Sequence, residues 1–215
     1  MILYRFFQHL VRAGWPLIGR LEIHGLENVP ERGPFLLIAN HQSILDPILV
    51  QAIVRRPLYT MAKSTQFTGR IMGWLMPRVL AFPVRRYRVD PQSVRVALRH
   101  LARGDGVGVY IEGERSWDGR LQTPRLGTVR LVLKAGVPVI PCGVSGTYHV
   151  WPRWHRGLRR APVCVSFGAP IHFPTLDHRA DREKALPETA AALMAAIRGQ
   201  LEFADRRVDS HAVRR

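Results

Sequence analysis

The stretch "PFLLIANHQSILDPILVQAIV", residues 34–54, predicts a buried strand followed directly by a helix. Its first part, "PFLLIAN", does not alternate with polar residues, which is typical of a strand covered on both faces in a parallel sheet. Its last part, "DPILVQAIV", predicts a helix with Asp46 as N-cap and Pro47 in the first turn. The residues between them form a turn, and in open α/β sheets ligands bind beyond the carboxyl ends of the strands, where such turns lie.

His41 and Asp46 stand five positions apart in this turn. On one continuous helix, residues five apart point about 140° apart and do not meet. A turn can fold back, so that the carboxylate reaches the imidazole, keeps one ring nitrogen protonated and leaves the other as a base. Ser43 could also cap locally. Taken alone, the stretch fits slightly better an ordinary helix cap beside an unrelated exposed histidine.

The rest of the chain continues the alternation of strands and helices. Strands are expected at 21–26, 35–40, 58–62, 79–84, 107–111, 137–144 and 163–167. Helices are expected between Asp90 and Gly104 and at 64–76, 126–135 and 187–203. This pattern predicts a single α/β domain with a mostly parallel mixed sheet flanked by helices. We assign the domain to residues 21–205 and expect a polar, frayed tail at 206–215.

Residues 1–20 have a different character. Apolar residues recur at helical spacing, with polar or basic residues on the opposite side. The apolar positions are Leu3, Phe6, Phe7, Leu10, Leu17 and Ile18, and the opposite positions are Arg5, Gln8 and Arg12. Such an N-terminal amphipathic helix suits a membrane interface, and it suits equally well a helix docked on the core of its own domain.

The composition indicates a globular protein with a strongly basic surface. The chain has 215 residues, of which 47% are hydrophobic, and carries a formal charge of +16. This charge favours an anionic partner: nucleic acid, a lipid headgroup surface or a phosphorylated substrate. Arginine dominates, because lysine occurs only at positions 63, 134 and 184, and arginine binds phosphate through two parallel hydrogen bonds.

Two observations concern the cellular setting. Cys142 and Cys164 form no CxxC pair and lie in apolar stretches, so we expect buried, reduced thiols and a cytoplasmic setting. No apolar run approaches the ~20 residues that a membrane-spanning helix requires. We therefore expect a protein that meets a membrane, if at all, from its surface.

Polar clusters follow two more of the expected strands. In "VYIEGERSWDGRL", Gly113 lets backbone amides approach an anion, and Arg115 can clamp a phosphate. In "FPVRRYR", the strand ends at Arg85, Arg86 and Arg88. Three clusters at one edge of one sheet would supply a base, its partner and a phosphate clamp, which together can activate a hydroxyl on a phosphorylated acceptor.

The segments "NHQSILDP", "FPVRR", "EGERS" and "GVPVIPCGVSGT", in this order and spacing, resemble the four motif blocks of the glycerolipid acyltransferases. The resemblance is greatest to the 1-acylglycerol-3-phosphate (lysophosphatidate) acyltransferases and covers about Leu21 to Pro170. It implies that residues 21–205 form an acyltransferase domain. Such enzymes move an acyl chain from acyl-CoA or an acyl-carrier protein to the free hydroxyl of a lysophospholipid, with no cofactor or metal.

The resemblance also implies roles for individual residues. His41 matches the catalytic histidine and Asp46 its partner, which gives the His-(X)4-Asp spacing of the family. Arg86 matches the arginine thought to hold the acceptor phosphate, with Arg85 as the fallback. The third block contributes the remaining substrate-binding positions, Glu112, Gly113, Arg115 and Ser116. The implied partners are the two substrates and an anionic membrane surface, with the protein peripheral on its cytoplasmic face.

This chain departs from the family pattern in its third block. Ile111 replaces a proline, Glu114 a threonine and Arg125 a lysine. The acidic Glu114 adds negative charge where the resemblance implies an acceptor phosphate, so an acceptor other than 1-acylglycerol-3-phosphate is an alternative.

A nucleic-acid-binding protein is an alternative of another class. Its best candidate surface is "WPRWHRGLRR", residues 151–160, where tryptophan and arginine are interleaved. The same mixture suits a lipid headgroup surface. A metal hydrolase has less support, because no HExxH or comparable histidine and aspartate set accompanies His41 and Asp46.

Overall fold

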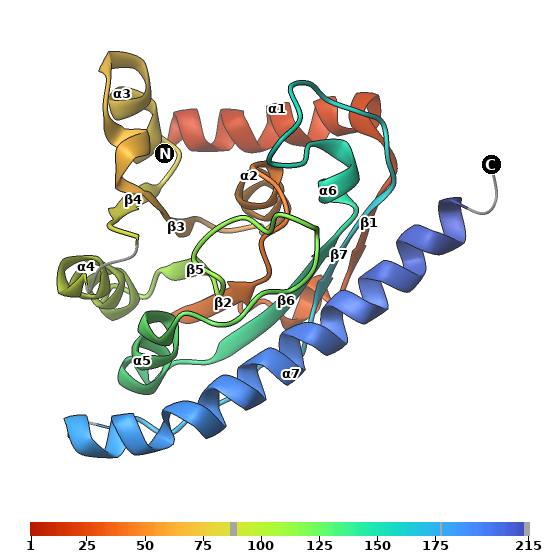
Figure 1. Ribbon diagram of the computed structural model, residues 1–215. Helices are drawn as coiled ribbons and strands as arrows, with labels where there is room; N and C mark the ends of the chain where they lie inside the picture. Colours follow the sequence, from red (N-terminus) through yellow and green to blue (C-terminus); the bar gives the residue numbers. More distant parts are fainter. Residues whose placement is uncertain (87–89, 177, 213–215) are drawn as a thin grey trace.

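The computed structural model describes residues 1–86, 90–176 and 178–212. Its centre is a seven-stranded sheet in the order β1-β7-β6-β2-β5-β3-β4 (Figure 1). The strands are β1 (Leu21–His24), β2 (Phe35–Ala39), β3 (Leu58–Lys63), β4 (Ala81–Val84), β5 (Gly106–Tyr110), β6 (Val139–Ser145) and β7 (Val163–Phe167). β6 and β7 pair in antiparallel fashion and the other neighbours are parallel, so the predicted fold class is confirmed.

Helices cover both faces of this sheet (Figure 1). They are α1 (Ile2–Ile18), α2 (Leu45–Ile53), α3 (Arg70–Arg78), α4 (Pro91–Ala102), α5 (Leu126–Ala135), α6 (Thr147–Val150) and α7 (Arg179–Ala212), with short 3-10 helices η1 (Leu26–Asn28) and η2 (Ser64–Phe67). One hydrophobic core joins the sheet to α1, α2 and α6, and a second joins it to α4, α5 and α7.

Strand β2 contributes to both cores. Phe35, Leu37 and Ala39 pack toward α1 and α2, whereas Leu36 and Ile38 pack toward α4, α5 and α7. Because successive side chains of a strand point to opposite faces, a strand covered on both faces must be apolar throughout. This explains the uninterrupted apolar run and confirms the interpretation of "PFLLIAN".

Helix α1 docks through a face that holds the buried side chains of Tyr4, Gln8 and Trp15, and Gln8 meets the carboxyl end of α2. The Gln8 side chain is buried and donates from Nε2 to the backbone oxygens of Gln51 (2.7 Å) and Val54 (2.9 Å). Arg12 donates from Nε to the oxygen of Ala52 (2.5 Å). The last carbonyls of a helix have no partner within it, so α1 supplies partners that α2 needs. Gln8 and Arg12, which the sequence places opposite the apolar positions of this helix, therefore both contact α2.

The opposite side of α1 leaves a row of apolar side chains on the surface. Phe6 and Leu10 are each 60% exposed and Leu17 is 79% exposed. Docking on the domain is therefore observed, and contact of this outer row with a membrane stays a prediction. Among the described residues, no helix has both the length and the hydrophobicity to cross a membrane.

Two other segments differ from the sequence-based expectation. The helix expected at 64–76 is divided into η2 and α3, because Gly69 takes a left-handed conformation (φ 87°) before α3 begins. The last helix begins earlier than 187 and continues past 203 to Ala212, with Val208 buried against Cys164. Residues 206–212 of the expected tail are therefore helical, and residues 213–215 lie outside the described part.

We expect Gln8→Ala to destabilise the protein by about 1–3 kcal/mol, because it removes the donor for two backbone oxygens at the end of α2. The free energy of unfolding can be measured in urea by tryptophan fluorescence. The exposed neighbour His9 provides the matched control, since His9→Ala should change stability by less than about 0.5 kcal/mol. Equal stabilities of the two variants would show that α1 does not cap α2.

Candidate active site

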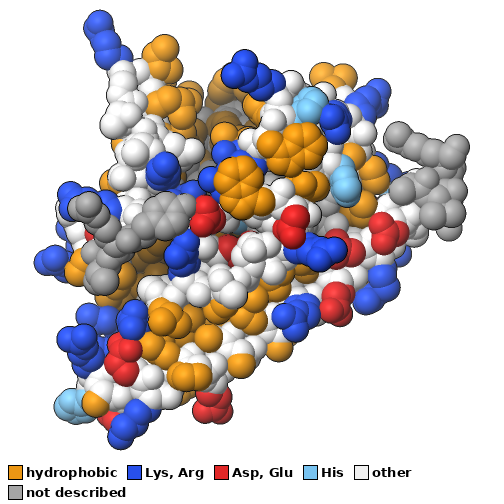
Figure 2. Space-filling view, viewed as in Figure 1, with side chains coloured by type: hydrophobic (Ala, Val, Ile, Leu, Met, Phe, Trp, Pro, Cys, Tyr) orange, Lys and Arg blue, Asp and Glu red, His pale blue; other side chains and the backbone are white. Residues whose placement is uncertain are grey.

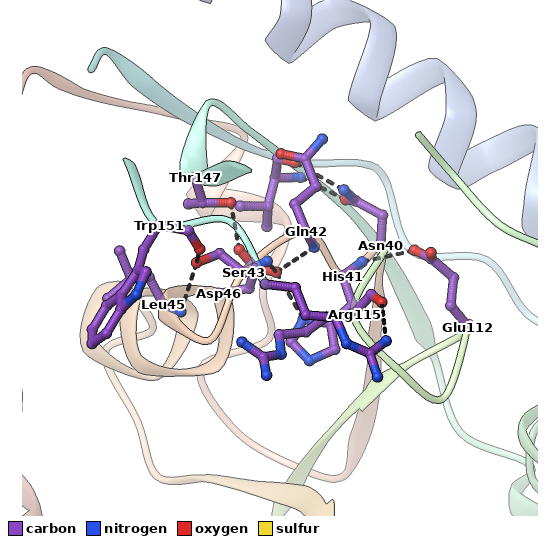
Figure 3. Close-up of polar contacts among 12 residues, drawn as sticks. Asn40, His41, Gln42, Ser43, Leu45, Asp46, Glu112, Arg115, Thr147 and Trp151 are labelled. Atoms are coloured by element: carbon purple, nitrogen blue, oxygen red, sulfur yellow. Dashed lines mark hydrogen bonds and ion pairs between the residues drawn. The ribbon is translucent and has the colours of Figure 1, made fainter. Parts of the chain in front are cut away.

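The loops that follow β2, β5 and β6 meet at one edge of the sheet, because these strands are neighbours there (Figure 1). Asn40, at the end of β2, exchanges two hydrogen bonds of 2.8 Å with the backbone of Val144 in β6. The backbone amide of Ser116, in the loop after β5, donates to the oxygen of His41 (2.8 Å). These contacts fix the turn that carries His41 between two other polar loops, as Figure 3 shows.

The His41 imidazole is bound to the Asp46 carboxylate, with 2.8 Å between Nδ1 and Oδ2 (Figure 3). The same oxygen accepts the backbone amides of Gln42 (2.6 Å) and Ser43 (2.8 Å), and Oδ1 accepts the hydroxyl of Thr147 (2.5 Å). Since an ionised carboxylate only accepts hydrogen bonds, Nδ1 of His41 carries the proton. The other ring nitrogen, Nε2, is then an acceptor that can serve as a base.

Asp46 reaches the imidazole from a position that differs from the expected one. Helix α2 begins at Leu45, so Asp46 lies in its first turn and is not its N-cap. Its fully buried carboxylate bends back over the preceding turn. Ser43 provides the local capping contact, because its Oγ accepts from the amide of Leu45 (3.2 Å) and donates to the backbone oxygen of Trp151 (2.7 Å).

The His41 ring packs against Tyr110, with 4.4 Å between the ring centroids and 31° between their planes. Tyr110 is the last residue of β5, and both side chains are buried. The packing restricts rotation of the imidazole, and Asp46 fixes its tautomer. Together they hold Nε2 in one orientation, as a general base requires.

Glu112 binds the protein backbone, although the resemblance assigns it to substrate. Its Oε1 accepts the amide of His41 (2.7 Å) and its Oε2 accepts the amide of Gln122 (3.1 Å). The carboxyl group is buried, and burial raises its pKa to about 7. Glu112 therefore anchors the loop after β5 to the His41 turn.

Gly113 and Ser116 also serve the shape of this loop. Gly113 has φ 71°, and a Cβ atom there would lie 2.7 Å from Cγ of Arg125, so both its conformation and its surroundings require glycine. Ser116 is buried and donates from Oγ to Asp118 (2.9 Å). The Ser116 hydroxyl is therefore engaged within its own loop.

Arg115 is the third-block residue best placed to meet a substrate. Its chain neighbour Ser116 is bonded to the His41 backbone, so the half-buried guanidinium extends from beside the imidazole (Figure 3). Burial lowers the pKa of Arg115, and the nearby positive charge of Arg153 lowers it further. Arg153 donates from Nη1 to the backbone oxygen of Arg115 (3.1 Å). The site therefore includes a second arginine that sequence motifs did not single out for it.

Arg85 and Arg86 lie apart from this group. They follow β4, the edge strand, which stands three strand positions from β2 and therefore about 14 Å away at the usual strand spacing. Arg85 is exposed and Arg86 partly buried. They share the carboxyl edge of the sheet with His41, as predicted, without being adjacent to it. Arg88 lies outside the described residues.

The cysteines are buried as expected, and burial disfavours the thiolate form of both. Cys142 and Cys164 are both free and buried. Burial raises the pKa of Cys164 to about 12 and that of Cys142 further still. Because the thiolate is the reactive form, a covalent acyl-cysteine has no support in this structure.

Outside the site, Glu22, His24 and Cys164 bring their ligand atoms close enough to share a metal ion, and they are the only such group in the described part of the chain. Arg207 occupies this place, with its Nε 3.3 Å from Glu22 and 3.4 Å from His24. The group is therefore best understood as an ion-pair network that fixes the end of α7 to β1.

Comparison with known proteins places the chain in a family. Residues 20–145 match the family model described as Acyltransferase. The chain is 32% identical to a chloroplastic 1-acyl-sn-glycerol-3-phosphate acyltransferase of Arabidopsis thaliana, over 78% of this chain and 49% of that protein. It is 24% identical to the 1-acyl-sn-glycerol-3-phosphate acyltransferase of Bacillus subtilis, over 88% of this chain and 92% of that protein.

The fold has a counterpart among solved structures. The crystal structure of the 1-acyl-sn-glycerophosphate acyltransferase PlsC from Thermotoga maritima superposes with a TM-score of 0.74 at 23% identity, covering 93% of this chain and 79% of that one. The chain spans about half the length of the plant relatives that it matches, 49% and 55% in two cases. The matched region contains strands β1 to β6, with His41, Asp46 and the third motif block, whereas Thr147 and Arg153 follow it, and the chain belongs to the acyltransferase family.

Proposed function

We propose that this protein transfers a fatty acyl chain from the thioester of acyl-CoA or acyl-carrier protein to the free hydroxyl of 1-acylglycerol-3-phosphate, forming phosphatidate. The observation that carries the proposal is the buried contact between His41 and Asp46, which leaves one imidazole nitrogen as a fixed base. Family membership and the printed names of the relatives support the reaction class and the acceptor.

In the proposed reaction, Nε2 of His41 takes the proton of the acceptor hydroxyl while its oxygen attacks the thioester carbonyl carbon. A carbon–oxygen bond forms, and the carbon–sulfur bond then breaks as the tetrahedral intermediate collapses. The imidazolium returns its proton to the departing sulfur, so the thiol leaves and the base is regenerated. Asp46 stabilises the imidazolium through its 2.8 Å contact. The chemistry requires no covalent enzyme intermediate, in keeping with the buried cysteines.

In this proposal, arginine side chains bind the phosphate of the acceptor. Arg115 lies beside His41, whereas Arg85 and Arg86 stand at the other end of the same edge, where they can meet a more distant part of a substrate. A different lysolipid acceptor is the second candidate, because Glu114 brings a carboxylate into the third block. An acyl-transfer assay over a panel of lysolipids, with both kinds of donor, decides between them. Failure to acylate any lysolipid would contradict the proposal.

We also propose that the protein works as a peripheral protein on the cytoplasmic face of an anionic membrane, because the lysolipid and the product reside in the bilayer. Besides the outer row of α1, Ile71 (78% exposed) and Trp74 (53% exposed) on α3 present apolar surface. Basic side chains are scattered over the face seen in Figure 2, interleaved with hydrophobic ones. Apolar insertion and attraction to anionic headgroups would then act together.

We expect His41→Ala to lower kcat/KM by about 10²–10⁴, the usual contribution of a general base, and Asp46→Asn to impair turnover severely. Steady-state rates with 1-acylglycerol-3-phosphate test this, with folding checked by circular dichroism. The exposed His178 supplies the control variant, His178→Ala, which should retain the wild-type rate. Near-normal turnover by pure His41→Ala protein would rule out the mechanism.

Glu112 should make stability depend on pH. Its pKa is about 7 in the folded protein and 4.5 in the absence of perturbation, so between these values the folded protein holds a proton that the unfolded chain has lost. The free energy of unfolding should therefore fall as the pH rises from about 4.5 to about 7, by on the order of 3 kcal/mol from this group.

Urea unfolding at several pH values measures this slope. Glu112→Gln should flatten it, since glutamine does not titrate, whatever its effect on stability at any one pH. The exposed Glu202 gives the control, because Glu202→Gln should keep the wild-type pH dependence. An unchanged slope in Glu112→Gln would show that Glu112 does not titrate in this range.

We expect binding to anionic vesicles to fall between about 0.1 and 1 M salt without vanishing, because screening removes the electrostatic part and leaves the apolar part. Deleting α1 would uncover the end of α2, so the apolar row is better tested by the triple variant Phe6→Ser, Leu10→Ser and Leu17→Ser. This variant should lose most of the salt-resistant binding in a co-sedimentation assay, whereas His9→Ser should not.

Vesicle binding also separates the two classes of protein considered from the sequence. Tight binding to neutral vesicles, unaffected by salt or by the triple variant, would contradict the membrane proposal. Protein that ignores all vesicles but binds DNA in a salt-sensitive way would favour the nucleic-acid alternative.

A further inference from the structure

The segment that follows α6 folds back over the third motif block. Arg153 donates from Nη1 to the backbone oxygen of Arg115 (3.1 Å) and forms an ion pair with Oε2 of Glu114 (3.1 Å). Its guanidinium carbon lies 3.8 Å from the centre of the Trp117 ring. Two positions before Arg153, the backbone oxygen of Trp151 accepts a hydrogen bond from Oγ of Ser43 in the His41 turn (2.7 Å). Arg153, from the basic stretch 151–160, therefore belongs to the surroundings of His41.

Glu114 holds two guanidinium groups in place. Its Oε1 contacts Nη2 of Arg125 (3.1 Å), and its Oε2 contacts Nη1 of Arg153 (3.1 Å). The acidic residue that stands in place of the family's threonine therefore does not present a bare negative charge to a substrate. It holds Arg125 and Arg153 in fixed positions. Arg153 in turn binds the backbone of Arg115, whose neighbour Ser116 binds the backbone of His41.

Two arginines and two glutamates of these loops line a small pocket, and Arg153 contacts two of its lining residues, Glu114 and Trp117. The pocket has a volume of about 160 Å³, and Arg115, Trp117 and Arg125 are among the residues that line it. Glu114 pairs with the guanidinium groups of Arg125 and Arg153, and the oxygens of Glu112 accept backbone amides. Among the described residues, no carboxylate forms an ion pair with Arg115. Half-buried like charges repel one another, so an anion that entered here would be strongly favoured.

Arg153 has donors to offer to such an anion. In the described part of the chain, each of its hydrogen bonds starts from Nη1, which leaves Nη2 and Nε with no protein acceptor. These two nitrogens form one edge of the guanidinium fork, and that edge matches two oxygens of a phosphate group. The Trp117 ring and the Glu114 carboxylate fix the plane of the fork.

We propose that Arg153 is a second arginine of the acceptor phosphate site, positioned by Glu114, and that Arg115 and Arg153 together select acceptors with a phosphate monoester headgroup. The inference rests on the proposed function, which it refines. In this proposal Glu114 does not repel the phosphate. It supports phosphate binding indirectly, because it positions Arg153, which contacts the phosphate.

Kinetics with paired acceptors test the selectivity. Arg153→Gln should lower kcat/KM for 1-acylglycerol-3-phosphate by about 10- to 100-fold, mainly through the acceptor KM, as expected for a lost charge-assisted hydrogen-bonding pair. A monoacylglycerol, which lacks the phosphate, should be affected by less than about twofold. Arg156→Gln removes an exposed charge from the same loop and should leave both acceptors unchanged. An equal loss for both acceptors, or none for either, would overturn the proposal.

The acyl donor also carries phosphate, so Arg153 has two possible phosphate partners, the acceptor and the donor. Comparing acyl-CoA with acyl-carrier protein distinguishes between them. The loss in Arg153→Gln should be the same with acyl-CoA and with acyl-carrier protein. A loss confined to acyl-CoA would show that Arg153 contacts the donor, which would overturn the assignment to the acceptor. In a Glu114→Gln background, Arg153→Gln should cost less than in the wild type, because Arg153 is already released from its position.

Binding of glycerol 3-phosphate, measured by isothermal titration calorimetry, gives a readout that does not depend on turnover. The wild type and Arg156→Gln should bind it, Arg153→Gln should bind at least about 10-fold more weakly, and Arg153→Lys should recover part of the affinity. Equal affinities of Arg153→Gln and wild type, or no binding by the wild type, would overturn the inference even if acyl transfer is observed. If the protein binds glycerol 3-phosphate but acylates no lysolipid, the proposed function is contradicted, whereas the phosphate site at Arg153 is still supported.

Discussion

The buried Asp46 carboxylate is the interaction on which the site depends. A charge removed from water must be matched by hydrogen bonds or by another charge, and Asp46 accepts from His41, from two backbone amides of the same turn and from Thr147. These donors come from the turn after β2 and from the start of α6. Satisfying one carboxylate therefore closes the turn, joins it to the segment after β6 and sets the tautomer of the imidazole. The catalytic geometry and the local fold are the same set of contacts.

A second acidic residue extends this scheme to the next loop. Glu112 accepts the amide of His41 on one oxygen and that of Gln122 on the other, so the loop after β5 is fastened to the turn after β2. The resemblance assigned Glu112 and Ser116 to substrate, yet both are buried and bound to groups of the protein itself. Residues that recur in a motif block can thus serve the substrate indirectly, by holding the backbone that carries Arg115. This distinction matters for substitutions, because loss of a loop anchor should disturb both substrates together.

Much of the fold could be predicted from the sequence, because burial on both faces gives strands such as β2 and β6 a largely apolar run. Helix α1 was harder: its apolar stripe is visible in the sequence, but the carbonyls at the end of α2 that Gln8 satisfies are created only by tertiary contact. Asp46 directly precedes a proline, a pattern that also suits an N-cap, and only the course of the turn shows that its carboxylate binds His41. Arg153 could not be found from motif spacing, since it lies 39 residues along the chain from its partner Glu114.

The contacts of Arg153 show that the basic residues of this protein do not form one uniform charged surface. From the sequence, the +16 charge and the stretch 151–160 appear as one diffuse surface suited to nucleic acid or lipid. In the structure the stretch divides: Arg153 turns inward onto Glu114 and Trp117, whereas Arg156 stays exposed. Charges of the first kind are held by partners and act over a few ångströms on one bound group, while charges of the second kind are screened by salt and act on a surface. Two neighbouring arginines of one loop can therefore serve substrate selection and membrane attraction separately, because burial, not sequence position, decides the range over which each charge is felt.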